Sequence, residues 1–158
     1  MVVRVFVSGC FDLLHAGHVE FFREAKEFGE AWSGRKPGEK VELIVSFASD
    51  EVLEKYKGRV SALPQEHKKF LLESIRFVDR VYLSTNPESS SLDFKDAFLK
   101  EKPTFLVVTS DDKFEKEKRE LCVQAGAQYV KLPKTPPKFL PISTTEIRER
   151  IIGQVKTK

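Results

Sequence analysis

The residues from Ser8 to His18, SGCFDLLHAGH, combine two glycines, a cysteine, an aspartate and two histidines. His15 and His18 are three positions apart, so on a helix they would share one face. At a helix start, free backbone N–H groups and the helix dipole favour an anion. Gly9 and Gly17 would let a ligand approach the backbone closely. Two imidazoles there could donate to phosphate oxygens and stabilise the charge that develops during phosphoryl transfer.

Two other interpretations of this segment remain open from the sequence. The two histidines could be ordinary polar residues at a helix start, or they could bind a metal ion together with Cys10. Zinc usually takes four ligands, and the other cysteine, Cys122, lies in an apolar helical context, which disfavours a metal site. We therefore expect no metal ion held by protein ligands.

Two further segments could contact phosphates. The run from Ser143 to Glu146, STTE, fits a capping box, and its hydroxyl and N–H groups could bind an anion or could simply cap a helix. The basic run from Lys55 to Arg59, KYKGR, could be a solvated loop. A lysine ammonium on its flexible stem would also suit a phosphate that moves.

The elements that must position these residues alternate between strand and helix patterns, which predicts a parallel sheet with helices on both faces. We expect strands at Val2–Ser8, Val41–Ala48, Val81–Leu83, Thr104–Thr109 and Ala127–Leu132. We expect helices at Gly17–Phe28, Ser49–Tyr56, Pro64–Val78, Leu92–Glu101 and Phe114–Ala125 and from Ser143 onward, with a loop at Gly29–Lys40. Ligands bind such sheets beyond the carboxyl ends of the strands, where the polar segments fall.

The string from Gly9 to His18 resembles the signature of the cytidylyltransferase-like nucleotidyltransferase superfamily, in which an H-x-G-H tetrad follows a G-x-F-D turn. The string from Ile142 to Arg148, ISTTEIR, is similar to that superfamily's I-S-T-T-x-I motif. The resemblance implies an α/β, Rossmann-like doubly wound fold with a five-stranded parallel sheet, and we expect residues 1–158 to form a single domain.

The chain also departs from the superfamily pattern. Lys68 stands where several cytidylyltransferases have arginine. The string from Thr109 to Lys113, TSDDK, lacks the glycine and tryptophan of a G-D-D-W motif. A proline-rich loop, from Pro133 to Pro141, stands where an R-T-x-G motif precedes I-S-T-T. These departures leave the nucleotide base and the acceptor open.

The resemblance implies roles for individual residues. His15 and His18 would stabilise the transition state and the leaving pyrophosphate, and Lys57 would neutralise the α-phosphate, which makes these three the catalytic residues. Lys55 and Asp12 would bind the acceptor. The nucleotide would be bound by Ser8, Gly9, Cys10, Phe11, Gly17, Asp111, Lys134, Lys138, Ile142, Ser143, Thr144 and Thr145.

The implied reaction transfers a nucleoside monophosphate from an NTP to a phosphorylated small molecule and releases pyrophosphate. We expect CTP, with glycerol phosphate, phosphocholine or phosphoethanolamine as acceptor, because the string from Ile142 to Ile147 is most similar to that branch. The alternatives are ATP with a heptose-type sugar 1-phosphate or with FMN, and a non-catalytic nucleotide-binding regulator. We expect Mg²⁺ as the counter-ion, held mainly by the NTP phosphates. A homodimer is compatible with this class.

The composition excludes several other classes. With 27 Lys and Arg against 24 Asp and Glu, the formal charge of +3 is too small to predict nucleic-acid binding. A hydrophobic content of 41% is too high for a disordered chain. No apolar run approaches the ~20 residues that cross a bilayer, so no membrane insertion is expected. Two cysteines and no secretory leader predict a cytoplasmic protein.

Overall fold

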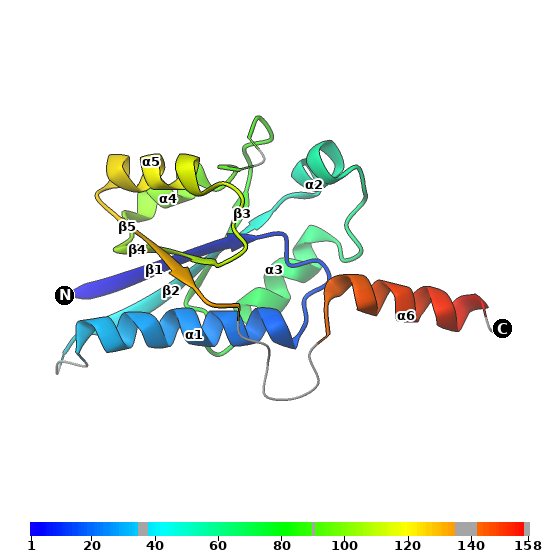
Figure 1. Ribbon diagram of the computed structural model, residues 1–158, viewed down its shortest axis with the longest axis horizontal. Helices are drawn as coiled ribbons and strands as arrows, with labels where there is room; N and C mark the ends of the chain where they lie inside the picture. Colours follow the sequence, from blue (N-terminus) through cyan, green and yellow to red (C-terminus); the bar gives the residue numbers. More distant parts are fainter. Residues whose placement is uncertain (35–37, 90, 135–141, 157–158) are drawn as a thin grey trace.

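The computed structural model describes residues 1–34, 38–89, 91–134 and 142–156. Figure 1 shows a central sheet with helices on both faces. Its five parallel strands have the order β3-β2-β1-β4-β5, so the order reverses at β1, as the Rossmann-like doubly wound prediction requires. The strands are β1 (Val2–Gly9), β2 (Lys40–Ala48), β3 (Arg80–Ser84), β4 (Phe105–Thr109) and β5 (Gln128–Leu132).

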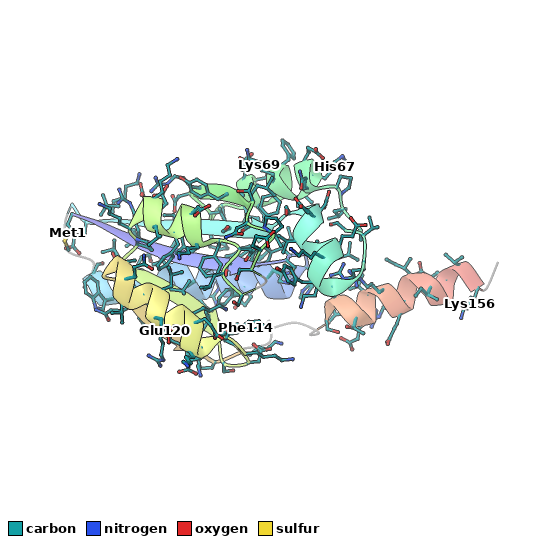
Figure 2. The ribbon with its side chains drawn as sticks, turned by 90° about the horizontal axis from the view of Figure 1, so that it is seen from above. Met1, His67, Lys69, Phe114, Glu120 and Lys156 are labelled. Carbon is teal, nitrogen blue, oxygen red and sulfur yellow. The ribbon has the colours of Figure 1, made fainter. Side chains whose placement is uncertain are left out.

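The sheet is apolar on both faces because its strands are parallel and covered by helices. Successive side chains point to opposite faces, so Val5 and Val7 pack toward α1 (Ala16–Ser33) and α3 (Gln65–Glu73). Phe6 packs on the other face, against α4 (Lys95–Glu101) and α5 (Glu115–Ala125). Figure 2 shows α3, with His67 and Lys69, and α5, with Phe114 and Glu120, at opposite sides of the molecule.

Two helices lie beyond the carboxyl ends of the strands. Helix α2 (Asp50–Lys57) begins as expected at Ser49, whose hydroxyl oxygen accepts a hydrogen bond from the Val52 N–H at 3.2 Å. Helix α6 (Thr144–Lys156) contributes no buried residue and extends away from the body (Figure 1). Within the four described ranges, no helix is long and apolar enough to cross a membrane.

The prediction of a loop at Gly29–Lys40 was wrong for Gly29–Ser33, which belong to helix α1. Helix α1 continues to Ser33 and ends where Gly34 takes a left-handed conformation with φ 66°. A Cβ atom on Gly29 would lie 2.7 Å from Val5 Cγ2 and 2.9 Å from a Val41 methyl group. The glycine therefore lets the helix approach the sheet closely, and this packing outweighs its low helix propensity.

The helix predicted from Pro64 to Val78 was too long, since α3 ends at Glu73. Its apolar residues Phe70 and Leu71 are 70% and 40% exposed, whereas Leu72 and Lys68 are fully buried. The helix therefore turns Phe70 toward solvent and packs the face that carries Lys68 and Leu72 against the core. The reason is tertiary: Lys68 lies beneath the loop that follows β1, where its Nζ approaches the Cys10 carbonyl oxygen at 3.5 Å.

Candidate active site

The two histidines lie at the start of α1, with ring centroids 4.0 Å apart. His15 is the N-cap residue, and its Nδ1 accepts a hydrogen bond from the Gly17 N–H at 3.0 Å. His18 Nδ1 accepts from the His15 N–H at 3.2 Å. Because each Nδ1 accepts, a neutral ring carries its proton on Nε2. Each imidazole therefore keeps an Nε2–H donor for a ligand.

Both imidazoles are uncharged at neutral pH. Burial, followed by the neighbouring His15 and Lys134, lowers the pKa of His18 to about 4. Burial and then Lys134 also lower the pKa of His15. The pair thus offers neutral N–H donors, while positive charge would come from lysines nearby.

The loop that carries the histidines is fixed by close packing. The Phe11 ring is buried and stacks edge-on against His18, with centroids 5.4 Å apart, and against Phe22 at 5.1 Å. A Cβ on Gly9 would lie 2.8 Å from the Phe11 ring, and one on Gly17 would lie 2.8 Å from His15 Cε1. Phe11, expected to bind nucleotide, is instead a core residue that supports His18. Gly9 and Gly17 thus leave room for the side chains of Phe11 and His15, which belong to the same loop.

Asp12, expected to bind the acceptor, instead holds the site together. Its side chain is fully buried, and its carboxylate accepts hydrogen bonds from Arg59 Nη1 at 2.5 Å and Arg148 Nη2 at 3.2 Å. The N–H groups of Ala62 and Leu63 donate to it at 3.1 and 3.2 Å. Burial alone would raise the pKa of Asp12, but these hydrogen bonds outweigh it and lower the pKa. Both carboxylate oxygens already accept hydrogen bonds from protein groups, and the side chain is fully buried. Asp12 therefore cannot contact the acceptor substrate in this arrangement.

The second motif lies directly against the first. Thr144 Oγ1 donates to the Leu13 carbonyl oxygen at 3.3 Å, although the two residues are 131 positions apart. Arg148 Nη2 also donates to the Asp12 carbonyl oxygen at 3.3 Å. Figure 1 shows the start of α6 beside the loop that follows β1. The two segments that resemble the superfamily motifs therefore form one site.

The start of α6 has the predicted capping box. The Ser143 N–H donates to Glu146 Oε2 at 2.6 Å, and the Glu146 N–H donates to Ser143 Oγ at 3.1 Å. Thr144 and Ile142 are half-buried, whereas Ser143 and Thr145 are exposed and open to a ligand.

A cavity of about 600 Å³ opens at the carboxyl ends of β1, β2 and β4, next to the start of the loop that carries the histidine pair. Neither His15 nor His18 is among the described residues that line it. Of the predicted site residues, it is lined by Ser8, Gly9, Cys10, Lys57 and Asp111. Its apolar lining consists of the partly exposed rings of Tyr56 and Phe114, with the core residues Val52, Leu53, Phe94 and Val108 behind the surface. Such a cavity is within the size range of small-molecule sites.

The other predicted lysines do not line the cavity. Lys55, expected at the acceptor, is 45% exposed and pairs with Glu88 at 3.4 Å. Lys134 is 71% exposed and pairs with Asp111 at 2.9 Å. Its positive charge contributes, after burial, to the lowered pKa of both histidines. Lys138 falls outside the described residues.

Five charged residues of this region were not among the predicted site residues. Arg59 and Arg148 bind Asp12, and Lys68 supports the Cys10 carbonyl group. Asp93 and Lys118 line the cavity. Arg148 lies within the second motif string and Arg59 ends the basic run, so both carried a signal, but nothing in the local sequence marks Asp93 or Lys118.

A metal site built from side chains does not fit this arrangement. Among the residues that the structure describes, no three His, Cys, Asp or Glu side chains gather as metal ligands. The Nδ1 atoms of His15 and His18 already accept backbone hydrogen bonds, and burial raises the pKa of the Cys10 thiol. The residues present therefore do not form a magnesium site, and we assign no step to a bound ion.

The strand order that reverses at β1, with the start of α6 hydrogen bonded to the loop that carries the histidine pair, is the architecture of a Rossmann-like nucleotide-binding domain. The chain belongs to the cytidylyltransferase-like family, whose model matches residues 6–150.

Curated relatives of two kinds match most of the chain. It is 36% identical over 152 residues to the FAD synthase of Pyrococcus horikoshii, covering 94% of this chain and 92% of that protein. It is 33% identical over 154 residues to the glycerol-3-phosphate cytidylyltransferase of Bacillus subtilis, covering 95% of this chain and 98% of that one.

A solved structure shares the fold. The crystal structure of the lipopolysaccharide core biosynthesis protein from Thermoplasma volcanium matches with a TM-score of 0.62 at 24% identity. The match covers 83% of this chain and 94% of the other.

Proposed function

We propose that this protein is an adenylyltransferase that joins the AMP part of ATP to FMN, forming FAD and pyrophosphate. The observation that carries the choice of acceptor is the cavity of about 600 Å³, with apolar and aromatic side chains in its lining, next to the start of the loop that carries the histidine pair. A planar, largely apolar ring system gains from such walls, whereas glycerol phosphate would bury little apolar area there. The full-length likeness to the Pyrococcus horikoshii FAD synthase supports the same choice.

The reaction needs no protein nucleophile. A phosphate oxygen of FMN attacks the α-phosphorus of ATP in line, and the bond from the α-phosphorus to the bridging oxygen breaks. Pyrophosphate leaves with that electron pair. The Nε2–H groups of His15 and His18 donate to phosphate oxygens, and Lys57, at the cavity edge, neutralises the α-phosphate. The exposed hydroxyls of Ser143 and Thr145 bind the outer phosphates.

The second candidate is the one preferred from the sequence, a CTP-dependent transfer to glycerol phosphate. Its support is the 33% identity to the Bacillus subtilis cytidylyltransferase. The higher identity to an FAD synthase supports ATP and FMN over this pair of substrates. We also propose that Mg²⁺ enters with the ATP phosphates, that residues 1–158 act as one domain in the cytoplasm, and that the chain forms a homodimer.

The test is a pyrophosphate-release assay that pairs ATP or CTP with FMN, glycerol 3-phosphate, phosphocholine and a sugar 1-phosphate. We expect turnover with ATP and FMN, with FAD identified by chromatography. Turnover with CTP and glycerol 3-phosphate alone would establish the second candidate. Saturable ATP binding without release from any pair would identify a nucleotide-binding regulator.

A further inference from the structure

Asp93 lines the cavity, yet no step of the proposed reaction uses it. It lies in the segment between β3 and α4, and a chain of buried hydroxyl groups holds it in place. Ser46 Oγ and Ser84 Oγ are 2.7 Å apart and both residues are buried. The Ser84 hydroxyl group and the backbone N–H groups of Asp93 and Phe94 lie close enough to the Asp93 carboxylate to lower its pKa against the larger effect of burial. The backbones of β2 and β3 therefore fix where this carboxylate lies.

The carboxylate is charged but has no ion-pair partner among the described residues. Burial raises the pKa of Asp93 to about 6, so the group is mostly ionised at neutral pH. The nearby cation Lys118 is already paired with Asp112 at 2.5 Å, and Asp112 also accepts a hydrogen bond from the Tyr129 hydroxyl at 2.7 Å. A partly buried, unpaired charge costs stability, and such groups concentrate at functional sites.

The position of Asp93 within the site indicates which part of an acceptor it would meet. Ser84 ends β3, which is two strands from β1, or about 10 Å at the usual strand spacing. The reacting phosphate must lie near the histidines, beyond the end of β1. An FMN held there by its phosphate, with its ribityl chain running past β2, would bring its ring to the end of β3.

We infer that Asp93 is a specificity residue for the acceptor, whose carboxylate accepts a hydrogen bond from the N3–H group of the flavin ring. This inference rests on FMN as the acceptor. The same negative charge repels phosphate, so an acceptor cannot bind with its ends exchanged. Tyr56 and Phe114, whose rings are partly exposed on the same cavity, supply apolar contact area for the flavin ring. Asp93 thus orients the acceptor, while the histidines and Lys57 act on its phosphate.

The test compares FMN with N3-methyl-FMN, which lacks the hydrogen-bond donor, in the wild-type enzyme and in Asp93→Leu, which lacks the acceptor. We expect the wild type to prefer FMN by about ten- to a hundredfold in kcat/KM, the range for a hydrogen bond to a charged group. Asp93→Leu should raise the KM for FMN by a similar factor, lose the preference, and leave the KM for ATP within about twofold. Asp96→Leu, at an exposed carboxylate on α4, is the matched control and should behave as wild type.

The outcomes separate this inference from the proposed function. Equal use of FMN and N3-methyl-FMN by the wild type overturns the role of Asp93 while FMN remains the acceptor, and this measurement needs no variant to fold. An unchanged KM for FMN in a folded Asp93→Leu protein also overturns it. No turnover of FMN by the wild type overturns the proposed function and this inference with it.

Discussion

The phosphate-handling region and the cavity beside it are built in different ways. The first consists of two short segments, 9–18 and 142–148, whose side chains are fixed by backbone hydrogen bonds and by each other. The second collects residues from β1, α2, the β3–α4 segment and the β4–α5 segment, and among its lining residues only Gly9 and Cys10 belong to a motif string. The contrast suggests that the first region defines the reaction class, while the second selects the acceptor.

The largest effect should come from the phosphate-handling region. His18→Ala removes one N–H donor to the reacting phosphates, and we expect kcat to fall by about two to three orders of magnitude with little change in the KM for FMN. Steady-state kinetics with an ATP and FMN pair measures this. His67→Ala, on the exposed side of α3, is the control. A kcat within threefold of wild type would remove His18 from the mechanism.

Lys57 lies where the two regions meet, so its replacement tests whether they are separable. Lys57→Ala should lower kcat by about ten- to a hundredfold, because positive charge at the α-phosphate is lost during transfer. Equilibrium binding of ATP should weaken much less. Lys69→Ala, a solvent-exposed lysine on α3, should leave both quantities unchanged. A loss confined to ATP affinity would contradict the proposed role.

Gly17→Ala perturbs only the phosphate-handling region. The new Cβ would lie 2.8 Å from His15 Cε1, so the His15 ring must move. We expect kcat to fall by about tenfold while FMN binding, measured by flavin fluorescence, is retained. Gly153→Ala is the matched control, since nothing lies within 4 Å of its Cβ position on α6. Loss of FMN binding in Gly17→Ala would show that the two regions are not independent.

The smallest effect is a difference in how the two regions respond to acid. His18 has a folded-state pKa of about 4 against 6.5 for a free histidine, so the unfolded chain binds more protons in this window and stability falls as the pH drops from 6.5 to 4. Asp93 has a raised pKa of about 6 against 3.8, so its contribution has the opposite sign and increases as the pH drops through 6.

Denaturant melts of the wild type, His18→Ala and Asp93→Asn between pH 7 and pH 4 would measure both contributions. His18→Ala should lose less stability in acid than the wild type, and Asp93→Asn should lose more. Parallel pH profiles of all three proteins would contradict both assignments.

Much of the fold was predictable because its signals are local. Short apolar runs that alternate along the chain with helical patterns predict all five strands, and hydroxyl residues at helix starts predict the caps at Ser49 and Ser143. The errors at Gly29 and Phe70 arose where a tertiary contact outweighed local preference. Gly29 lies in a helix because it touches Val5 and Val41, and Phe70 is exposed because α3 buries Lys68 instead.

By itself, the sequence predicted two imidazoles at one helix start and a hydroxyl-rich capping box at a second helix start, and the structure has both. Only the tertiary structure decided that Asp12 and Phe11 support this site from within and that Asp93 lies on the wall of a cavity. The physical reason is range. Caps and periodicity depend on residues a few positions apart, whereas burial and ion pairing depend on side chains that only the folded chain brings together.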